Sequence, residues 1–154
     1  MPLEIELHGE TALIVTRRFT APPATVYTAH TDADLVQKWM LGPPGWFMPV
    51  CEYDARVGGK IRIQWRSEDG EELLLTGEFL SLDPPHRMVH TEIFHMPDPA
   101  PTNTITTTFK DDGEGGCLLH MVMELPDADA RQAMLDMGMA EGMEQSYARL
   151  DAIL

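Results

Sequence analysis

Residues 142–154 read GMEQSYARLDAIL, and this stretch decides the fold class because it has the period of a helix. Its larger apolar residues recur every three or four positions, so one helical face carries Met143, Tyr147, Leu150 and Leu154. Met134 and Met137 extend this stripe upstream, and Asp127 or Asp129 can cap its start. The sequence therefore predicts one long terminal helix with a single apolar face.

The chain before Pro126 has the shorter period of β-strands. Ile61, Ile63 and Trp65 alternate with polar residues, which is typical of a half-buried strand. Similar patterns predict strands over residues 11–20, 46–54, 60–67, 73–83, 87–95, 103–110 and 117–125. Two short helices are expected over residues 23–30 and 32–40, because Pro23 suits a first helical turn and Asp32 can cap the second helix.

These elements predict one domain of the α+β class. A largely antiparallel sheet must bury one face, and the terminal helix is the only element long enough to cover it. We therefore expect a helix-grip fold: a curved antiparallel β-sheet around a long C-terminal α-helix, with two short helices after the first strand. The 154 residues contain no repeat and no linker, so we expect a single domain over residues 1–154.

The charge balance disfavours several classes of partner. The chain has 25 acidic and 11 basic residues and a net charge of −14, which opposes binding to nucleic acid and to anionic membranes. No apolar run approaches the roughly 20 residues that span a bilayer. The segment Met1 to Glu10 lacks the basic and apolar regions of a signal peptide. We therefore expect a cytoplasmic protein with Cys51 and Cys117 as reduced thiols.

Four segments carry a resemblance to a known family. They are Arg17-Arg18-Phe19-Thr20-Ala21-Pro22-Pro23 with Val26 and Trp39, Asp54-Ala55-Arg56-Val57-Gly58-Gly59-Lys60, Gly77 with Asp83-Pro84-Pro85-His86-Arg87-Met88-Val89, and Gly142 to Leu154. In this order and spacing they resemble the START-like (SRPBCC, Bet v 1-type) superfamily. They are most similar to the branch named for the activator of heat-shock protein 90 ATPase homologue, C-terminal-domain-like. The resemblance covers residues 11–154 and implies one START-like domain.

The resemblance implies a cavity between the sheet and the terminal helix, suited to an apolar small molecule. Superfamily members include lipid and hormone binders, polyketide cyclases and a co-chaperone domain, and the fold does not select among these functions. The chain departs from the family in two places. Met143 follows Gly142 where tryptophan is frequent, and His90 and Glu92 stand where aromatic residues are frequent. Both departures fall in the implied cavity.

Bulky apolar residues are the first candidates for the cavity wall, because ligand sites combine mostly apolar walls with a few polar groups. The candidates are Trp39, Trp65, Met121 and Met137. Trp46 is a further candidate, and for all three tryptophans packing in the core is the equal alternative to a place in the wall. Six of the 11 methionines gather in the terminal helix and the last strand, where they form either a pliable wall or an ordinary core filling: Met121, Met123, Met134, Met137, Met139 and Met143.

His90 and Glu92 are candidate polar contacts on which two lines of reasoning disagree. The local pattern places Val89, Thr91 and Ile93 on the apolar face and leaves His90 and Glu92 in solvent. The resemblance implies that His90 and Glu92 face the cavity. In that position the pair could perform general acid–base chemistry on a bound molecule.

Arg17 is a candidate ligand contact for a different reason. It shares its strand parity with Val15 and Phe19, so its side chain should face the core. A buried guanidinium needs a partner. That partner is either an acidic side chain, in a structural ion pair, or the anionic group of a ligand.

Motifs for other chemistry are missing from the sequence. His90-Thr91-Glu92 has the H-x-E spelling of zinc deaminases, but no Pro-Cys-x-x-Cys accompanies it. No nucleophile elbow, P-loop or dinucleotide fingerprint occurs. We therefore expect no metal and no cofactor.

The favoured function is binding of a small apolar or aromatic ligand in the cavity, without catalysis of its own. The first alternative is a cyclase-like or hydrolase-like enzyme that uses His90, Glu92 or Arg17, so whether the protein is an enzyme stays open. A further alternative is a chaperone-modulating interaction domain. We do not expect that role, because the domain stands without the separate N-terminal domain of the eukaryotic co-chaperone. Formation of a homodimer also stays open.

Overall fold

The computed structural model describes residues 2–95 and 98–154, and within them an eight-stranded antiparallel sheet forms the body of the molecule. The strand order is β1-β2-β8-β7-β6-β5-β4-β3. The strands are β1 (Glu4–His8), β2 (Ala12–Phe19), β3 (Trp46–Tyr53), β4 (Lys60–Ser67), β5 (Glu72–Asp83), β6 (Arg87–His95), β7 (Asn103–Asp111) and β8 (Cys117–Glu124). All the strands expected from the sequence are present, and β1 is an addition.

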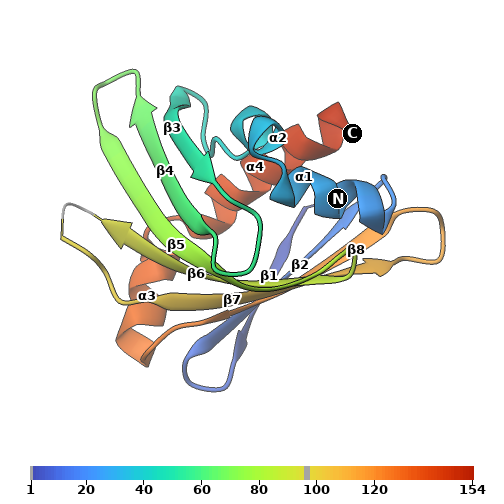
Figure 1. The fold of residues 1–154 in the computed structure, drawn as a ribbon. Coiled ribbons are helices and arrows are strands. Elements are labelled where there is room, and N and C mark those ends of the chain that lie inside the picture. Colours follow the sequence, from blue (N-terminus) through green and yellow to red (C-terminus); the bar gives the residue numbers. More distant parts are fainter. Residues whose placement is uncertain (1, 96–97) are drawn as a thin grey trace.

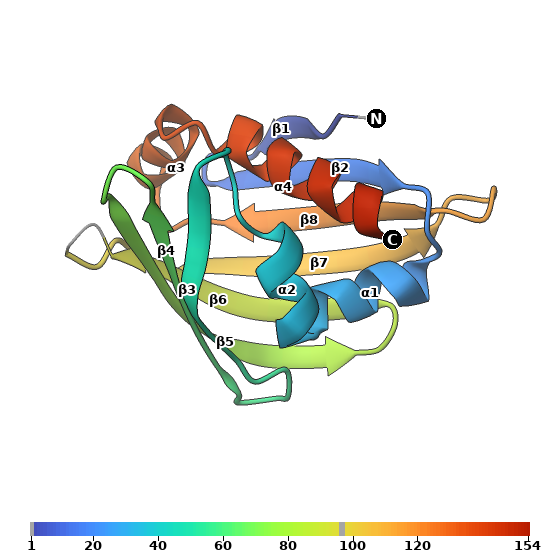
Figure 2. The ribbon, with the colours of Figure 1, turned by 90° about the horizontal axis from the view of Figure 1, so that it is seen from above.

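Four helices accompany this sheet in the described residues: α1 (Pro23–Thr31), α2 (Ala33–Trp39), α3 (Ala128–Asp136) and α4 (Met139–Ile153). The sheet curves, and α1, α2 and α4 lie on its concave side (Figure 1). Seen from above, α4 runs along β2 and β8, while α1 and α2 lie beside it over the middle strands (Figure 2). This arrangement confirms the α+β helix-grip fold.

Local sequence signals explain where three of the helices begin. Pro22 precedes α1 in an extended conformation, and Pro23 occupies the first helical turn. Asp32 caps α2 by accepting hydrogen bonds from the amides of Asp34 and Leu35. Asp127 caps α3 by accepting a hydrogen bond from the amide of Ala130. Asp127, one of the two caps proposed for the terminal helix, therefore caps α3, whereas the final helix α4 has Gly138 at its N-cap and no side-chain cap.

The long C-terminal helix is present as α4, but it begins at Met139 and not at residue 127 or 129, because Gly138 separates it from the shorter helix α3. Gly138 has a φ of 77°, a left-handed conformation that favours glycine over other residues. Its amide donates to the carbonyl of Leu135, which closes the end of α3. A glycine inside a helical pattern is tolerated often enough that the apolar stripe alone could not reveal this break.

The strand β1 was missed because it is a short edge strand with little buried surface. It pairs with β2 in an antiparallel register in which Ile5 lies opposite Val15. Glu4 and Glu6 flank Ile5 and are accessible, and Leu7 is also exposed. A strand of this kind lacks the apolar face that marks a strand in sequence.

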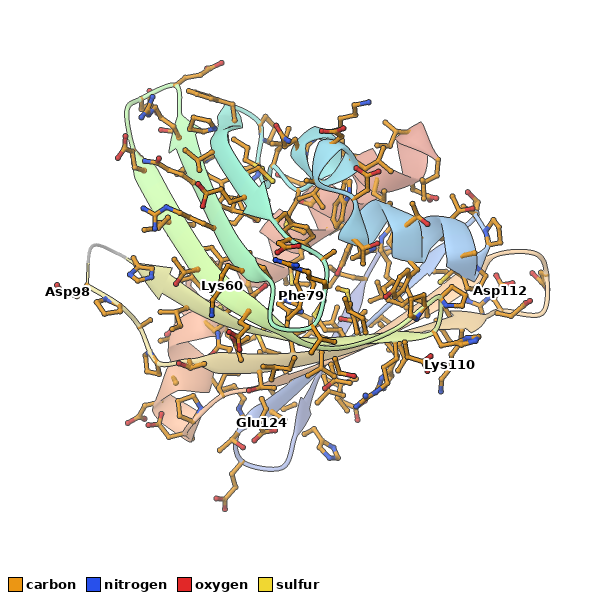
Figure 3. All side chains as sticks on the ribbon, in the orientation of Figure 1. Lys60, Phe79, Asp98, Lys110, Asp112 and Glu124 are labelled. Carbon is orange, nitrogen blue, oxygen red and sulfur yellow. The ribbon has the colours of Figure 1, made fainter. Side chains whose placement is uncertain are left out.

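The main core lies between the concave face of the sheet and the helices. On β8, Met121 and Met123 are buried on this face, whereas Glu124 is exposed. Figure 3 places the Glu124 side chain on the other side of the sheet, away from α1, α2 and α4. Leu150 of α4 is completely buried against the core, as expected from the helical stripe. Among the described residues, no helix has both the length and the apolar composition needed to cross a bilayer.

Candidate functional site

A cavity of about 380 Å³ lies between the sheet and the helices. Its wall takes side chains from α1, α2, the segment after α2, the strands β3 to β8, and the region from α3 to α4. The candidates from the sequence that border it are Trp39, Trp65, His90, Glu92, Met121 and Met137. The fold therefore brings six side chains together from four elements, α2, β4, β6 and β8, and from the turn after α3.

Tryptophans form rigid parts of this wall because their ring nitrogens are tied to backbone carbonyls. Trp39 Nε1 donates to the carbonyl oxygen of Ala29 at 2.9 Å, and Trp65 Nε1 donates to that of Met40 at 2.8 Å. Trp46 also borders the cavity. With its N–H bound elsewhere, each of the first two rings offers the cavity mainly apolar surface.

Methionines form much of the remaining wall. Those that border the cavity are Met40, Met88, Met121, Met123, Met134, Met137, Met139 and Met143. Met137 is 47% exposed, so it lies where the cavity meets solvent, in the turn between α3 and α4. Unbranched thioether side chains adjust to irregular shapes, which makes this side of the wall adaptable.

Hydrogen bonds from side chains of α4 to backbone atoms connect the end of α2 and the segment after it to α4. Ser146 Oγ accepts a hydrogen bond of 2.8 Å from the amide of Gly42. The guanidinium of Arg149 donates to the carbonyl oxygens of Trp39 and Gly42 at 3.0 and 3.1 Å. These contacts hold that side of the cavity to the helix.

His90 and Glu92 lie inside, so the expectation from local pattern that both face solvent is wrong. His90 is 6% exposed, and its Nε2 lies 2.9 Å from Glu92 Oε2. Both side chains border the cavity, whereas Val89 and Thr91 point to the opposite face of β6. The pattern misled because both faces of this strand carry apolar residues. The implication of the resemblance matches the observed orientation.

His30 is a cavity residue that the sequence analysis missed. Its Nδ1 lies 2.8 Å from the carbonyl oxygen of Val26, one helical turn earlier. Burial lowers the pKa of His30 to about 4, so the ring is neutral at physiological pH. Because a carbonyl oxygen only accepts, Nδ1 carries the proton and Nε2 is left as an acceptor. No sequence signal distinguished this histidine from a solvated one.

Two tyrosines complete the polar side of the cavity. The hydroxyl of Tyr53 donates to the backbone carbonyl of His30 at 2.7 Å. Burial, reinforced by the nearby Glu92 carboxylate, raises the pKa of both Tyr53 and Tyr147, so both remain protonated phenols. Tyr147 was recognised only as part of the apolar stripe of the terminal helix.

Arg17 does not border the cavity; it links β2 to α4. Its Nε and Nη2 each lie 3.0 Å from a carboxylate oxygen of Glu144, and its Nη1 lies 3.7 Å from Asp151 Oδ2. The hydrogen bonds from Arg17 lower the pKa of the Glu144 carboxyl. The structure therefore favours the structural ion pair over a ligand anchor, because the guanidinium already has anionic partners.

Other chemistry finds little support among the described residues. Within residues 2–95 and 98–154, no three His, Cys, Asp or Glu side chains gather in a way that could hold a metal ion. Cys51 and Cys117 are free thiols, and burial raises the pKa of Cys117 to about 11. That thiol is therefore poorly suited to act as a nucleophile.

The fold around this cavity is shared with known proteins. A family model described as "Activator of Hsp90 ATPase homolog 1-like protein" matches residues 20–154. The chain is similar to a crystal structure from Rhodobacter sphaeroides, with 30% identity, a TM-score of 0.91, and coverage of 99% of this chain and 97% of that chain. It is also similar to a crystal structure from Mycobacterium smegmatis, with 28% identity, a TM-score of 0.87, and coverage of 99% and 97%. No curated protein matches the sequence.

Proposed function

The chain belongs to the family of Activator of Hsp90 ATPase homolog 1-like proteins, and we propose that it binds a small apolar or aromatic molecule between the sheet and α4. The observation that carries this proposal is the cavity itself, at about 380 Å³. Ligand pockets generally measure about 300–1,000 Å³ and have mostly apolar walls. The family's description refers to activation of a chaperone ATPase. In the described residues, however, the cavity favours ligand binding as the function.

The composition of the wall supports an aromatic occupant in particular. Flat rings from Trp39, Trp65 and Tyr147 border the space together with adaptable methionines. Aromatic surfaces attract a second ring through edge-to-face and offset contacts, beyond the effect of burial alone. An aromatic molecule with two fused rings is therefore a suitable first probe.

A substitution at Gly142 offers a test, because this helical glycine borders the cavity and has space beside it. A Cβ atom at position 142 would meet Pro43 Cδ at 3.9 Å as its nearest neighbour. Gly142→Leu should place a side chain in the cavity, and Gly142→Ala is the matched control that removes the glycine but leaves the space. Binding of 2-naphthol is measured by calorimetric titration and by the stabilisation that it causes in thermal denaturation.

Wild type and Gly142→Ala should bind 2-naphthol with similar affinity, and Gly142→Leu should bind it at least tenfold more weakly. For wild type at a hundredfold excess over the dissociation constant, binding should stabilise the fold by about 2.7 kcal/mol. Equal binding by all three proteins would place the probe outside the cavity. The absence of any binding to wild type would contradict the proposal for this probe class.

Acid–base catalysis in the same cavity is the second candidate, and the contact of 2.9 Å between His90 and Glu92 favours it. Such a pair can transfer a proton to or from a bound substrate, an effect of about 10²–10⁴-fold in rate. Hydrolysis of 2-naphthyl acetate, followed by naphthol release, tests a hydrolase-like reaction. Glu92→Gln should lower the rate of hydrolysis by about 10²–10⁴-fold and leave naphthol binding intact. An unchanged rate would show that the pair of His90 and Glu92 does not take part in catalysis.

A further inference from the structure

The polar side of the cavity contains two buried nitrogen atoms that lack a hydrogen-bond partner among the described residues. The first is Nε2 of His30, a residue that is 2% exposed and borders the cavity. Nδ1 of this ring bonds to the Val26 carbonyl and therefore carries the proton. Nε2 thus presents a lone pair and can only accept a hydrogen bond.

The second atom is Nδ1 of His90, on the strand β6. Nε2 of the same ring lies 2.9 Å from a carboxylate oxygen of Glu92, so Nε2 is the donor in that contact. In the neutral ring, Nδ1 is then a second acceptor without a partner. Two histidines from separate elements thus offer the cavity the same kind of group, and buried acceptors of this kind are normally satisfied.

Four donor groups near the cavity are already bound to protein atoms, whereas the Tyr147 hydroxyl, which also borders the cavity, has no hydrogen bond to another described residue. The Tyr53 hydroxyl donates to the backbone of His30, and the indole of Trp39 donates to the backbone of Ala29. The guanidiniums of Arg17 and Arg149 are held by carboxylates and by carbonyls, respectively. The described residues that line the cavity include no lysine and no arginine, and their charged member is a glutamate.

This distribution selects among the molecules that an apolar cavity could hold. A ligand carboxylate would meet Glu92 with no free cation to offset the repulsion. A carbonyl or ether oxygen could accept from the Tyr147 hydroxyl, but it would leave the two histidine nitrogens without a donor. A hydroxyl group on an apolar body would supply the missing proton without the desolvation of a full charge.

On the basis of the proposed function, we propose that the ligand is a neutral hydroxyl compound, a phenol or alcohol with an apolar body, whose O–H donates to His30 Nε2 or His90 Nδ1. The apolar body lies against the tryptophan and methionine wall. Recognition of the hydroxyl is thus separate from the burial of the rings, and the two contributions can be measured independently.

Four naphthalene probes of similar size separate these contributions: 2-naphthol, 2-methoxynaphthalene, 2-naphthoate and 2-(aminomethyl)naphthalene. Calorimetric titration at neutral pH should rank 2-naphthol first. The methyl ether, which lacks the donor, should bind about tenfold more weakly, the usual scale for one hydrogen bond to a buried group. The carboxylate should bind more weakly still.

The variants His30→Phe and His90→Phe keep a flat ring and remove one acceptor each. The variant that loses the true acceptor should bind 2-naphthol and the methyl ether within about twofold of each other. Its affinity for the ether should stay close to that of wild type, which separates loss of the acceptor from loss of the cavity. If a variant does not fold, the ranking of the four probes on wild type still decides the proposal.

Three results would overturn the hydroxyl assignment while leaving the proposed function standing. These are equal binding of 2-naphthol and its ether, tighter binding of the carboxylate or of the ammonium, and an unchanged preference in both histidine variants. If none of the four probes binds wild type, the proposed function fails together with this inference.

Discussion

The two halves of α4 face the same sheet, yet one half closes the core and the other borders a cavity. In the C-terminal half, Tyr147 and Leu150 are 3% and 0% exposed. The ring of Tyr147 lies 5.4 Å from that of Phe19, edge to face, and 5.8 Å from that of Trp39. Tyr147, near the middle of the helix, also presents part of its ring to the cavity, whereas Leu150 does not line it; in the N-terminal half, Gly142 and Met143 border open space.

Side-chain shape explains this difference. Branched and aromatic side chains fill the C-terminal half in fixed positions, as in other protein interiors. A glycine and unbranched methionines in the N-terminal half leave volume and can adjust around a guest. The comparison assigns stability to one half of the helix and binding to the other, and each assignment can be tested.

The largest expected effect comes from truncating the packed half. Leu150→Ala should cost about 2–5 kcal/mol of unfolding free energy, because it opens a hole in a fully buried site. Met143→Ala, on the cavity side, should cost less than about 1.5 kcal/mol, because its side chain is only partly buried. Urea denaturation measures both. A loss of unfolding free energy below about 1 kcal/mol for Leu150→Ala would show that the buried face of α4 is assigned wrongly.

His30 of α1, whose ring centroid lies 6.1 Å from that of Tyr147, should make stability depend on pH. Its pKa is about 4 when folded against 6.5 when exposed, so the unfolded chain binds more protons between these values. Stability should therefore fall as the pH drops from about 6.5 to about 4, by about 3 kcal/mol at most. Denaturation at a series of pH values checks this.

His30→Phe provides the control for that pH dependence. The variant lacks the titrating ring, so its loss of stability over the same pH window should be clearly smaller than that of wild type. Equal pH profiles for the two proteins would show that His30 is not the group responsible.

The ion pair between Arg17 and Glu144 should have a smaller effect, because the Glu144 side chain is 29% exposed. Glu144→Gln should cost about 1–2 kcal/mol at neutral pH. The pKa of Glu144 is lowered on folding, so the contribution is present above the unfolded value and is lost as the pH falls through the folded one. Wild type and Glu144→Gln should therefore converge in acid; a constant difference would contradict this.

The smallest effect should come from Gly142→Ala, which should stabilise the protein. Alanine favours a helix interior over glycine by about 0.5–1 kcal/mol, and the added Cβ has no neighbour closer than 3.9 Å. Thermal denaturation resolves a change of this size. A destabilised variant would mean that the helix half beside the cavity is more tightly packed than the structure indicates.

Elements with a strong period were predictable from sequence, and features set by a single residue or by tertiary packing were not. The alternation around Ile63 and the stripe around Leu150 each specify an element and its buried face. The break at Gly138 depends on one dihedral angle, and β1 buries too little surface to leave a pattern.

The candidate site divides in the same way. Trp39 and Trp65 were predictable as wall residues because bulky apolar groups gather around such cavities. The orientation of His90 was not predictable from the sequence. Both faces of β6 carry apolar residues, and only the register of the sheet decides which face lies inside. His30 and Tyr53 reach the cavity through contacts between α1 and β3 that no local pattern encodes.

The most direct test of the central claim is the methyl NMR spectrum of the methionines during titration with 2-naphthol. If the probe enters the cavity, ring currents should shift the methyl signals of Met121, Met123 and Met143, which border it. Met48, which is not among the lining residues, serves as the internal control. Shifts confined to the cavity methionines are the result we predict. Saturation of binding with those three signals unmoved would contradict the account.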